Sequence, residues 1–242
     1  MVQPLTSPSK YWRAAGERQE SVNDLFDRAA VHYDRACRLM SFGTGQSYRR
    51  EALQRAGLKA GMRVLDIGTG TGLLAREAAA LVGAQGLVIG IDPSFGMLLA
   101  GRNSFAGTTV RGLGERLPFT TGQFDFLTMG YALRHVCDLD QAFAEYARVL
   151  KPGGQVLLLE ITVPSSRITR ALLRAYLGGV VPLLTRWSTR SRDAGSLMHF
   201  YWDTIVRCVP AEVVLASLRR SGFTAERLVM NAIFSEYRGV LR

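Results

Sequence analysis

The sequence predicts an α/β protein with a central, mostly parallel sheet, helices on both faces and an antiparallel hairpin at its C-terminal end. Short apolar runs alternate with amphipathic segments at the spacing of βαβ units. The run at residues 64–67 breaks into three glycines separated by threonines, as expected where a buried strand turns sharply into a helix. With 242 residues, 48% of them hydrophobic, the chain suits one sizeable domain with a full core.

The composition of the chain limits the cellular compartments and the classes of binding partner that are expected. The net charge of +10 predicts a surface that attracts anions, whether nucleic acid, acidic lipid headgroups or an acidic substrate. The cysteines number three and are widely separated, which argues against a disulfide framework and against a CxxC metal site. Neither a signal peptide nor an apolar stretch of about 18 residues is evident. We therefore expect a cytoplasmic protein, soluble or peripheral at a membrane.

The chain is expected to begin with a flexible arm at residues 1–20, which are rich in proline, serine and charge. A single domain is then expected over residues 21–242. Apolar residues recur at helical spacing from Ser21, so a first helix is predicted to run to about His32.

A lid is predicted over residues 21–60, because this segment precedes the first strand and can lie across a ligand cleft. Its aromatic and methionine side chains Tyr33, Met40 and Phe42 are candidates for contact with a substrate. The alternative is that these three side chains only pack against the sheet.

The glycine-rich turn predicts a nucleoside-type cofactor, because glycines let a ligand lie directly on the backbone at a helix N-terminus. A dinucleotide fingerprint is disfavoured, since its third glycine would fall on Leu73. Asp92 ends the second apolar strand, where a carboxylate can accept hydrogen bonds from both ribose hydroxyls. Asp66, two residues before the first glycine, is placed to meet an ammonium group.

The remaining elements follow from periodicity and from turn residues. Strands are predicted at residues 64–67, 87–92, 108–113, 124–129 and 155–162, and helices at residues 51–58, 73–82, 97–102 and 138–150. In such sheets ligands bind at the carboxyl ends of the strands. The glycine turn, Asp92, the turn at Gly114 and Glu115 and the loop at residues 131–136 should therefore converge.

From residue 164 to about residue 207 the alternation lapses, and a helical cap is predicted over the active-site end of the sheet. The segment carries seven arginines, and its apolar run is too short to cross a bilayer. Four interpretations are left open: reception of a substrate tail, contact with an anionic membrane, an ordinary amphipathic cap, or a homodimer face. A helix at residues 210–220 and two strands at residues 224–229 and 232–241 close the chain.

Several sequence segments together resemble one family, the ubiquinone/menaquinone C-methyltransferases of the UbiE type. The segments are FDRAAVHYD (26–34), LMSFG (39–43), VLDIGTGTG (64–72), ERLPF (115–119), FDFLTMGYALRHV (124–136) and RVLKPGG (148–154). The resemblance implies a Rossmann-like class I methyltransferase fold, S-adenosyl-L-methionine as cofactor and an aromatic small-molecule substrate.

The resemblance also extends the predicted cofactor site, since residues just after the third strand contact the adenine in comparable methyltransferases. The predicted cofactor-binding residues are Asp66, Gly68, Thr69, Gly70, Thr71, Gly72, Asp92, Met97, Leu113, Gly114, Glu115 and Gly130. The chain departs from the family pattern at several positions, which are Cys37, Arg38, Gly45, Tyr48, Leu113, Gly114, Gly130 and His135. These departures leave the identity of the methyl acceptor open.

Two adjacent residues are the candidates for catalysis. Methylation of a phenolic ring carbon requires loss of the phenolic proton, so a cation that stabilises phenolate or a base is useful. Arg134 is the candidate cation, because guanidinium is always charged, and His135 is the candidate base. His199, among aromatic residues, is a candidate for the substrate pocket, with a core or interface role as the alternative. No metal site is predicted, because the histidines are widely separated.

Three other functions were weighed against methylation of a ring carbon. An O- or N-methyltransferase acting on a specialised small molecule is the main alternative. Nucleic-acid methylation would agree with the charge, but the chain has neither a [DN]-P-P-[YF] quartet nor a Pro-Cys nucleophile, so no nucleic-acid partner is expected. A non-enzymatic cofactor-binding protein would share the same glycine turn.

Overall fold

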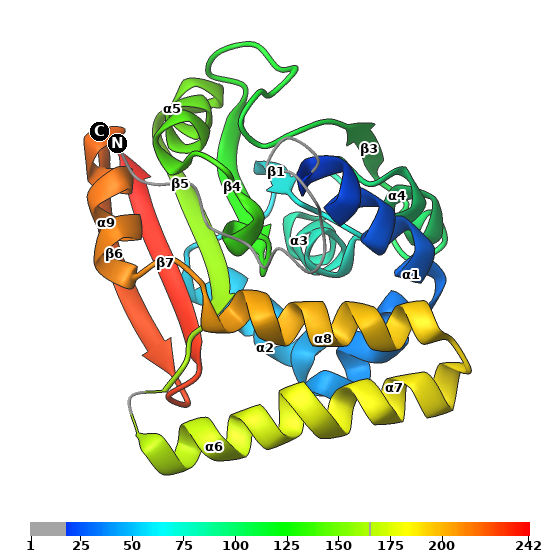
Figure 1. Ribbon diagram of the computed structural model, residues 1–242. Helices are drawn as coiled ribbons and strands as arrows, with labels where there is room; N and C mark the ends of the chain where they lie inside the picture. Colours follow the sequence, from blue (N-terminus) through cyan, green and yellow to red (C-terminus); the bar gives the residue numbers. More distant parts are fainter. Residues whose placement is uncertain (1–17, 165) are drawn as a thin grey trace.

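The computed structural model describes residues 18–164 and 166–242 and contains a seven-stranded sheet (Figure 1). Its strand order is β3-β2-β1-β4-β5-β7-β6. The strands are β1 Arg63–Ile67, β2 Leu87–Asp92, β3 Thr108–Arg111, β4 Phe124–Gly130, β5 Leu150–Ile161, β6 Phe223–Met230 and β7 Phe234–Leu241. The first five are parallel and β7 is antiparallel to both β5 and β6, which confirms the predicted fold class.

The strand order reverses at β1, which has β2 on one side and β4 on the other. In open α/β sheets this switch point opens a crevice at the carboxyl ends of the strands. The register places Asp66 of β1 opposite Thr128 of β4. The glycine turn therefore leaves the sheet at the position where a ligand is expected.

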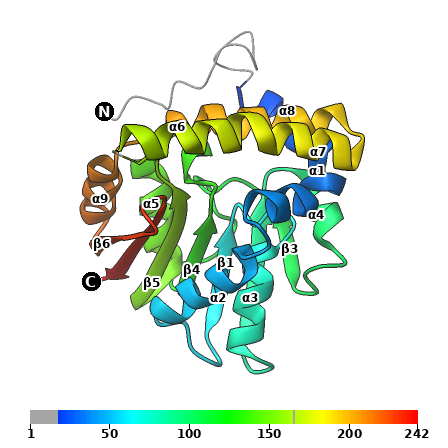
Figure 2. The same cartoon turned by 90° about the horizontal axis from the view of Figure 1, so that it is seen from below.

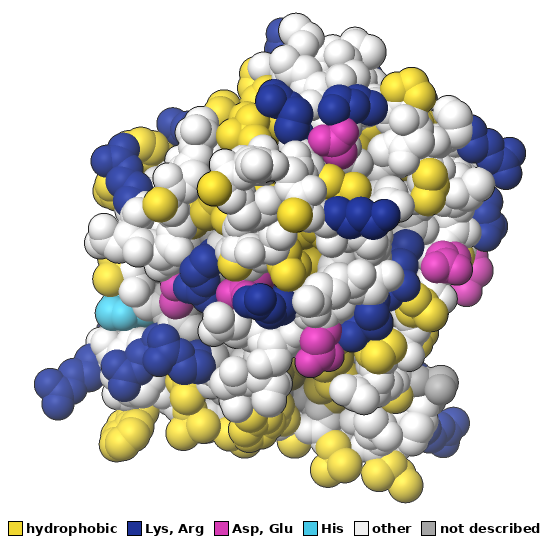
Figure 3. Space-filling model, turned by 180° about the vertical axis from the view of Figure 1, so that it is seen from behind, with side chains coloured by type: hydrophobic (Ala, Val, Ile, Leu, Met, Phe, Trp, Pro, Cys, Tyr) yellow, Lys and Arg dark blue, Asp and Glu magenta, His cyan; other side chains and the backbone are white. Residues whose placement is uncertain are grey.

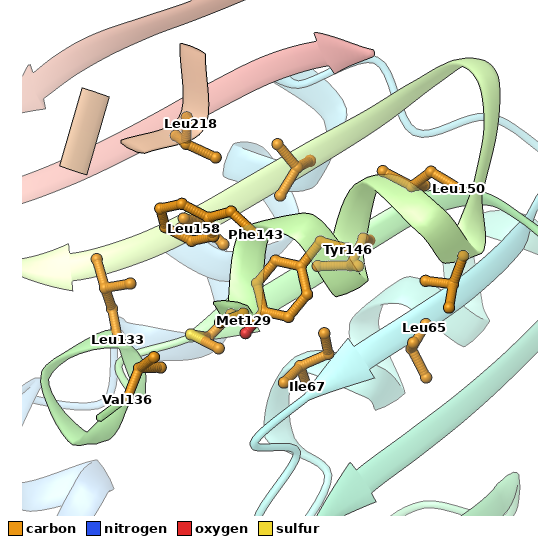
Figure 4. Packing of buried hydrophobic residues seen from close by; sticks show 14 of the residues in the cluster. Leu65, Ile67, Met129, Leu133, Val136, Phe143, Tyr146, Leu150, Leu158 and Leu218 are labelled. Carbon is orange, nitrogen blue, oxygen red and sulfur yellow. The ribbon is translucent and has the colours of Figure 1, made fainter. Parts of the chain in front are cut away.

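Two helical layers bury the two faces of the sheet. The helices α2 Gly45–Arg55 and α3 Leu73–Val82 pack with Val64 and Phe126 on one face. On the other face, the helices α5 Leu139–Val149 and α9 Ala211–Arg220 pack over β1, β4 and β5. Figure 4 shows this second layer, with Phe143 and Tyr146 of α5 set against Ile67 and Met129. Alternate strand residues thus point into opposite cores, as a pleated strand requires.

The first helix is longer than predicted. α1 spans Arg18–Met40 without interruption, whereas the sequence predicted an end near His32. The buried positions continue to Ala36 and Cys37 at helical spacing, and no glycine or proline occurs between Arg18 and Gly43. The helix ends where Phe42 and Gly43 take positive φ angles of 50° and 78°. The first 17 residues of the predicted arm lie outside the described residues, and its last three begin α1.

The cap predicted at residues 164–207 consists of helices over the carboxyl end of the sheet (Figure 2). They are α6 Arg167–Ala175, a π-helical turn Tyr176–Val180, α7 Val181–Thr189 and α8 Arg192–Val206. α8 lies against α1 and the sheet, and α6 and α7 form one long rod outside it (Figure 1). In the part of the chain that the structure describes, no helix is long and apolar enough to span a membrane.

Candidate active site

The glycine turn between β1 and α3 has the backbone that its sequence demands. Gly68, Gly70 and Gly72 all have positive φ angles, of 63°, 57° and 81°. A Cβ on Gly68 would lie only 2.6 Å from the Cβ of Ala132, because the loop after β4 approaches closely. Position 68 therefore requires glycine for two reasons: its φ angle is positive, and there is no room for a Cβ.

Gly68→Ala should destabilise the protein more than Gly61→Ala does. Gly61 also has a positive φ, of 80°, but its Cβ would have nothing within 4 Å. Gly61→Ala therefore measures only the cost of placing alanine at a positive φ, about 1 kcal/mol. Gly68→Ala adds the clash with Ala132, which we expect to cost a further ~1–3 kcal/mol. Urea unfolding of both variants measures the difference, and equal losses would show that the loop after β4 can move aside.

Asp66 is a buried carboxylate with one oxygen unused. Its Oδ1 accepts a hydrogen bond from Thr128 Oγ1 at 2.7 Å, while Oδ2 has no partner among the described residues. Burial raises the pKa of Asp66 to about 6. The side chain lines a cavity of about 30 Å³ together with Tyr33, Arg49 and the glycine turn. A buried acid facing a cavity is suited to a cationic group of a ligand.

The stability of the protein should fall as pH rises from about 4 to about 6, and Asp66→Asn should remove part of this fall. The folded protein holds the Asp66 proton more tightly than the unfolded chain, in which an aspartate has a pKa near 3.9. Protonation of Asp66 thus contributes up to ~3 kcal/mol to the free energy of unfolding. This contribution is fully present below about pH 4 and is lost by about pH 6. Denaturant unfolding at several pH values tests this, and parallel profiles for the two proteins would contradict it.

Asp92 holds the glycine turn in place. Its Oδ2 accepts the Gly70 N–H and its Oδ1 the Ser94 N–H, both at 2.8 Å, and burial raises its pKa to about 6. Met97 packs against Gly70. Asp92 and Met97 line neither of the two cavities beside the turn, so their contact with the ribose remains a prediction.

A second cavity, of about 90 Å³, lies on the other side of Gly68. Its lining brings together four of the predicted residues, Leu113, Gly114, Glu115 and His135. Glu115 also accepts the Cys137 N–H at 2.9 Å, which fixes the loop after β4 against the turn after β3. The predicted residues Thr69, Thr71 and Gly130 line the Asp66 cavity instead. The two cavities meet at Gly68, where one extended ligand can occupy both.

Arg134 is buried in a short 3-10 helix, Leu133–His135, after β4. Its Nη1 forms an ion pair with Glu160 Oε1 at 2.6 Å, and its Nε donates to Thr204 Oγ1 at 3.1 Å. The guanidinium lies 4.5 Å from the centroid of the Tyr201 ring. Its Nη2 has no hydrogen-bond partner among the described residues. One buried, charged donor is thus without a protein partner, and Arg134 lines neither of the two cavities, so its contact with a ligand remains a prediction.

His135 lies between aromatic rings. It stacks on Phe200, with centroids 5.5 Å apart and an interplanar angle of 13°, and meets Phe26 edge-on. Burial and the nearby Arg134 charge hold the pKa of His135 well below its usual value, so the ring is neutral at pH 7. Its Nε2 has no partner within the described chain.

The predicted lid residues do not all reach the site. Tyr33 does, and its hydroxyl is hydrogen-bonded to the Tyr201 hydroxyl at 2.5 Å. Met40 packs against the cap. Phe42 is 78% exposed and stacks on Tyr176, because the longer α1 carries it past the cavities. His199 is also exposed, since its neighbours on either side in α8 face inward. Neither Phe42 nor His199 lines the two cavities.

Three residues at the site escaped the sequence analysis. Asp27 accepts hydrogen bonds from Ser94 Oγ and, at 2.8 Å, from the Gly96 N–H, while Asp34 accepts from Thr71 Oγ1 at 2.5 Å. Both acids come from α1, seven residues apart, so they lie on one face of the helix. That spacing was a usable signal, had the helix been predicted to continue beyond His32.

Arg49 is the third such residue. Its guanidinium lies 5.6 Å from the centroid of the Tyr131 ring and borders the Asp66 cavity. It gives the cavity a cation as well as the acid Asp66, a pair suited to the carboxylate and ammonium of an amino-acid group. Nothing in the sequence distinguished it from the neighbouring arginine, Arg50.

α1 covers the site in this structure. Its acids bind both the glycine turn and the start of helix α4 Phe95–Gly101. The two cavities beneath it, of about 90 and 30 Å³, are far below the several hundred Å³ that a nucleoside-sized ligand needs. The lid function of α1 remains a prediction, in which α1 moves outward when a ligand enters.

Comparison with known proteins identifies the family. The model of the ubiE/COQ5 methyltransferase family matches residues 14–228. The ubiquinone/menaquinone biosynthesis C-methyltransferase of Hahella chejuensis is 36% identical over 209 residues, 84% of this chain and 82% of that protein. The demethylmenaquinone methyltransferase of Symbiobacterium thermophilum is 37% identical over 175 residues, 69% and 70% of the two chains.

A solved structure agrees with the fold. The crystal structure of a SAM-dependent methyltransferase of Thermotoga maritima, named a possible histamine N-methyltransferase, has a TM-score of 0.64 at 21% identity. The match covers 90% of this chain and 99% of that one. The family model and the two relatives confirm the resemblance noted in the sequence, and the chain belongs to the ubiE/COQ5 methyltransferase family.

Proposed function

We propose that the protein transfers the methyl group of S-adenosylmethionine to a ring carbon of a phenolic or quinol molecule. Family membership supports methyl transfer, and relatives named for ubiquinone and menaquinone biosynthesis support this class of acceptor. The observation that carries the acceptor chemistry is the unpartnered Nη2 of buried Arg134.

The residues around the glycine turn fit the cofactor. Asp66 offers its free oxygen to the ammonium of the methionine part, and Arg49 lies across the same cavity for the carboxylate. The cavity that contains Leu113 and Gly114 suits a flat, largely apolar base. S-adenosylmethionine supplies a methyl group bound to a sulfonium, which a carbon nucleophile can displace in line.

Arg134 is proposed to bind the phenolate oxygen of the acceptor. Its guanidinium is fixed by Glu160 and Thr204, so the two N–H bonds of Nη2 are oriented before the substrate arrives. Loss of the phenolic proton makes the ring carbon nucleophilic, and a charge-assisted hydrogen bond favours the ionised form. His135, unpartnered at Nε2, is proposed to receive that proton, although burial and the Arg134 charge lower its pKa and make it a weak base.

An O- or N-methyltransferase remains the second candidate, because the chain departs from the family pattern at residues near the acceptor. Purified protein with S-adenosylmethionine should be assayed with a short-chain demethyl-quinol and with a panel of phenols and amines. NMR of the product then shows where the methyl group lies. A new C–CH₃ group supports the proposal, whereas a methyl ether or a methylamine from the preferred acceptor overturns it.

The cytoplasmic setting, the homodimer and the contact with a membrane remain predictions from the sequence. Of these, the membrane contact is the one that the described surface allows us to argue further.

A further inference from the structure

The rod formed by α6, the π-helical turn and α7 exposes apolar side chains where a helix on a protein usually exposes polar ones. Every side chain of α6 is exposed or half-buried. We call the exposed apolar set the outer helix face, which consists of Ile168, Leu172, Val180, Leu183, Leu184 and Trp187. Among these, Ile168 is 75%, Leu183 68% and Trp187 81% exposed.

The outer helix face is one continuous strip. Ile168 and Leu172 are four residues apart, as are Leu183 and Trp187, so each pair lies on one side of its helix. In Figure 3 apolar side chains project along the bottom edge of the molecule, which is the edge formed by α6 and α7 in Figure 1. Phe42 extends the strip from the lid, because it stacks on Tyr176 of the π-helical turn.

The charged residues of the segment that carries this strip have one sign. Residues 161–192 contain neither Asp, Glu nor Lys. They contain six arginines, Arg167, Arg170, Arg174, Arg186, Arg190 and Arg192. An exposed apolar strip with arginines beside it and a tryptophan at one end has the composition of helices that lie in a membrane interface.

We propose that the outer helix face docks on the surface of a bilayer that contains anionic lipids. The apolar side chains enter the boundary between headgroups and acyl chains, and the arginines bind the lipid phosphates. The charge disfavours a second copy of this chain as the occupant. A two-fold interface on this face would bring two sets of like-charged arginines together.

The docked rod would place the acceptor site close to the lipid. α8 packs against α7 and supplies Tyr201 and Thr204, which contact Arg134. The docking proposal does not depend on the identity of the acceptor, since it concerns adsorption and not methyl transfer. An acceptor with a lipid tail would gain most from it.

Flotation of the purified full-length protein with vesicles tests the proposal. The vesicles are phosphatidylcholine alone or phosphatidylcholine with about 30% phosphatidylglycerol, a content that gives a clearly negative surface. We expect binding to the anionic vesicles that weakens at high salt. The variant L172S/L183S/W187S should lose this binding at least tenfold. The control V31S/L99S/V229S, with three exposed apolar residues outside the outer helix face, should bind as the parent does.

A third variant tests the charges. R167Q/R174Q/R186Q should weaken binding to anionic vesicles by roughly fivefold for each arginine, as expected near an anionic surface. Circular dichroism checks that all variants are folded. Absence of parent binding to anionic vesicles overturns the proposal, as does equal loss in the control. A parent dimer in light scattering that L172S/L183S/W187S converts to monomer, without vesicle binding by the parent, overturns it in favour of self-association.

Discussion

Replacement of Asp66 by asparagine should weaken the binding of S-adenosylmethionine by roughly two orders of magnitude, because truncating one partner of a buried charge pair costs about 2–5 kcal/mol. Asparagine keeps the size of the side chain and can still accept the hydrogen bond from Thr128. It loses the negative charge of the oxygen that faces the cavity. Isothermal titration calorimetry at pH 7.5 measures the change in Kd.

The control for this experiment is Asp140→Asn. Asp140 lies in α5, where it accepts hydrogen bonds from Ser217 and Arg220, remote from the glycine turn. It should leave the Kd unchanged. Misfolding does not explain a loss of binding in Asp66→Asn, because removal of a buried charge should stabilise the protein at this pH. An unchanged Kd for Asp66→Asn would refute the assigned role of the carboxylate.

Arg134→Met should destabilise the protein by about 3–5 kcal/mol, because it leaves the Glu160 carboxylate buried without its cation. The double variant R134M/E160Q removes both charges and should recover most of that stability. The glutamine introduced by E160Q can still accept the Ile161 N–H, which Glu160 Oε1 accepts at 2.7 Å. Urea unfolding of the two variants measures the difference.

The same double variant separates structure from catalysis. It should be folded yet transfer methyl groups about 10²–10³-fold more slowly, because the donor for the phenolate is gone. A control is R238M/E236Q in the C-terminal hairpin, which removes the ion pairs of another buried glutamate, with Arg238 at 2.6 Å and with Arg55 at 2.7 Å. Full activity of R134M/E160Q would show that Arg134 serves only stability.

Features that depend on neighbours in the chain were predictable from the sequence. The strands and the glycine turn follow from local periodicity and from φ angles that only glycine adopts readily, and α3 was predicted with its observed bounds. Asp66 was placed correctly at the carboxyl end of the first strand, because the end of that strand and the following turn fix its position. The family resemblance added the fold and the cofactor, and family membership was confirmed.

Features that depend on packing between distant segments were not predictable. The predicted end of α1 was about two turns too early. An amphipathic pattern does not show where a helix ends when the residues that follow are also buried at helical spacing. The outward positions of Phe42 and His199 depend on which helix faces are covered.

The sequence by itself determined the order of strands and helices, the glycine turn and the acid before it, since these are set by residues adjacent in the chain. Only the tertiary structure determined which residues interact with the charged guanidinium of Arg134. Its partners Glu160 and Thr204 lie 26 and 70 residues away, on β5 and α8. A buried charge needs partners that the fold brings close to it. Because these partners are distant in the sequence, no local sequence pattern identifies them.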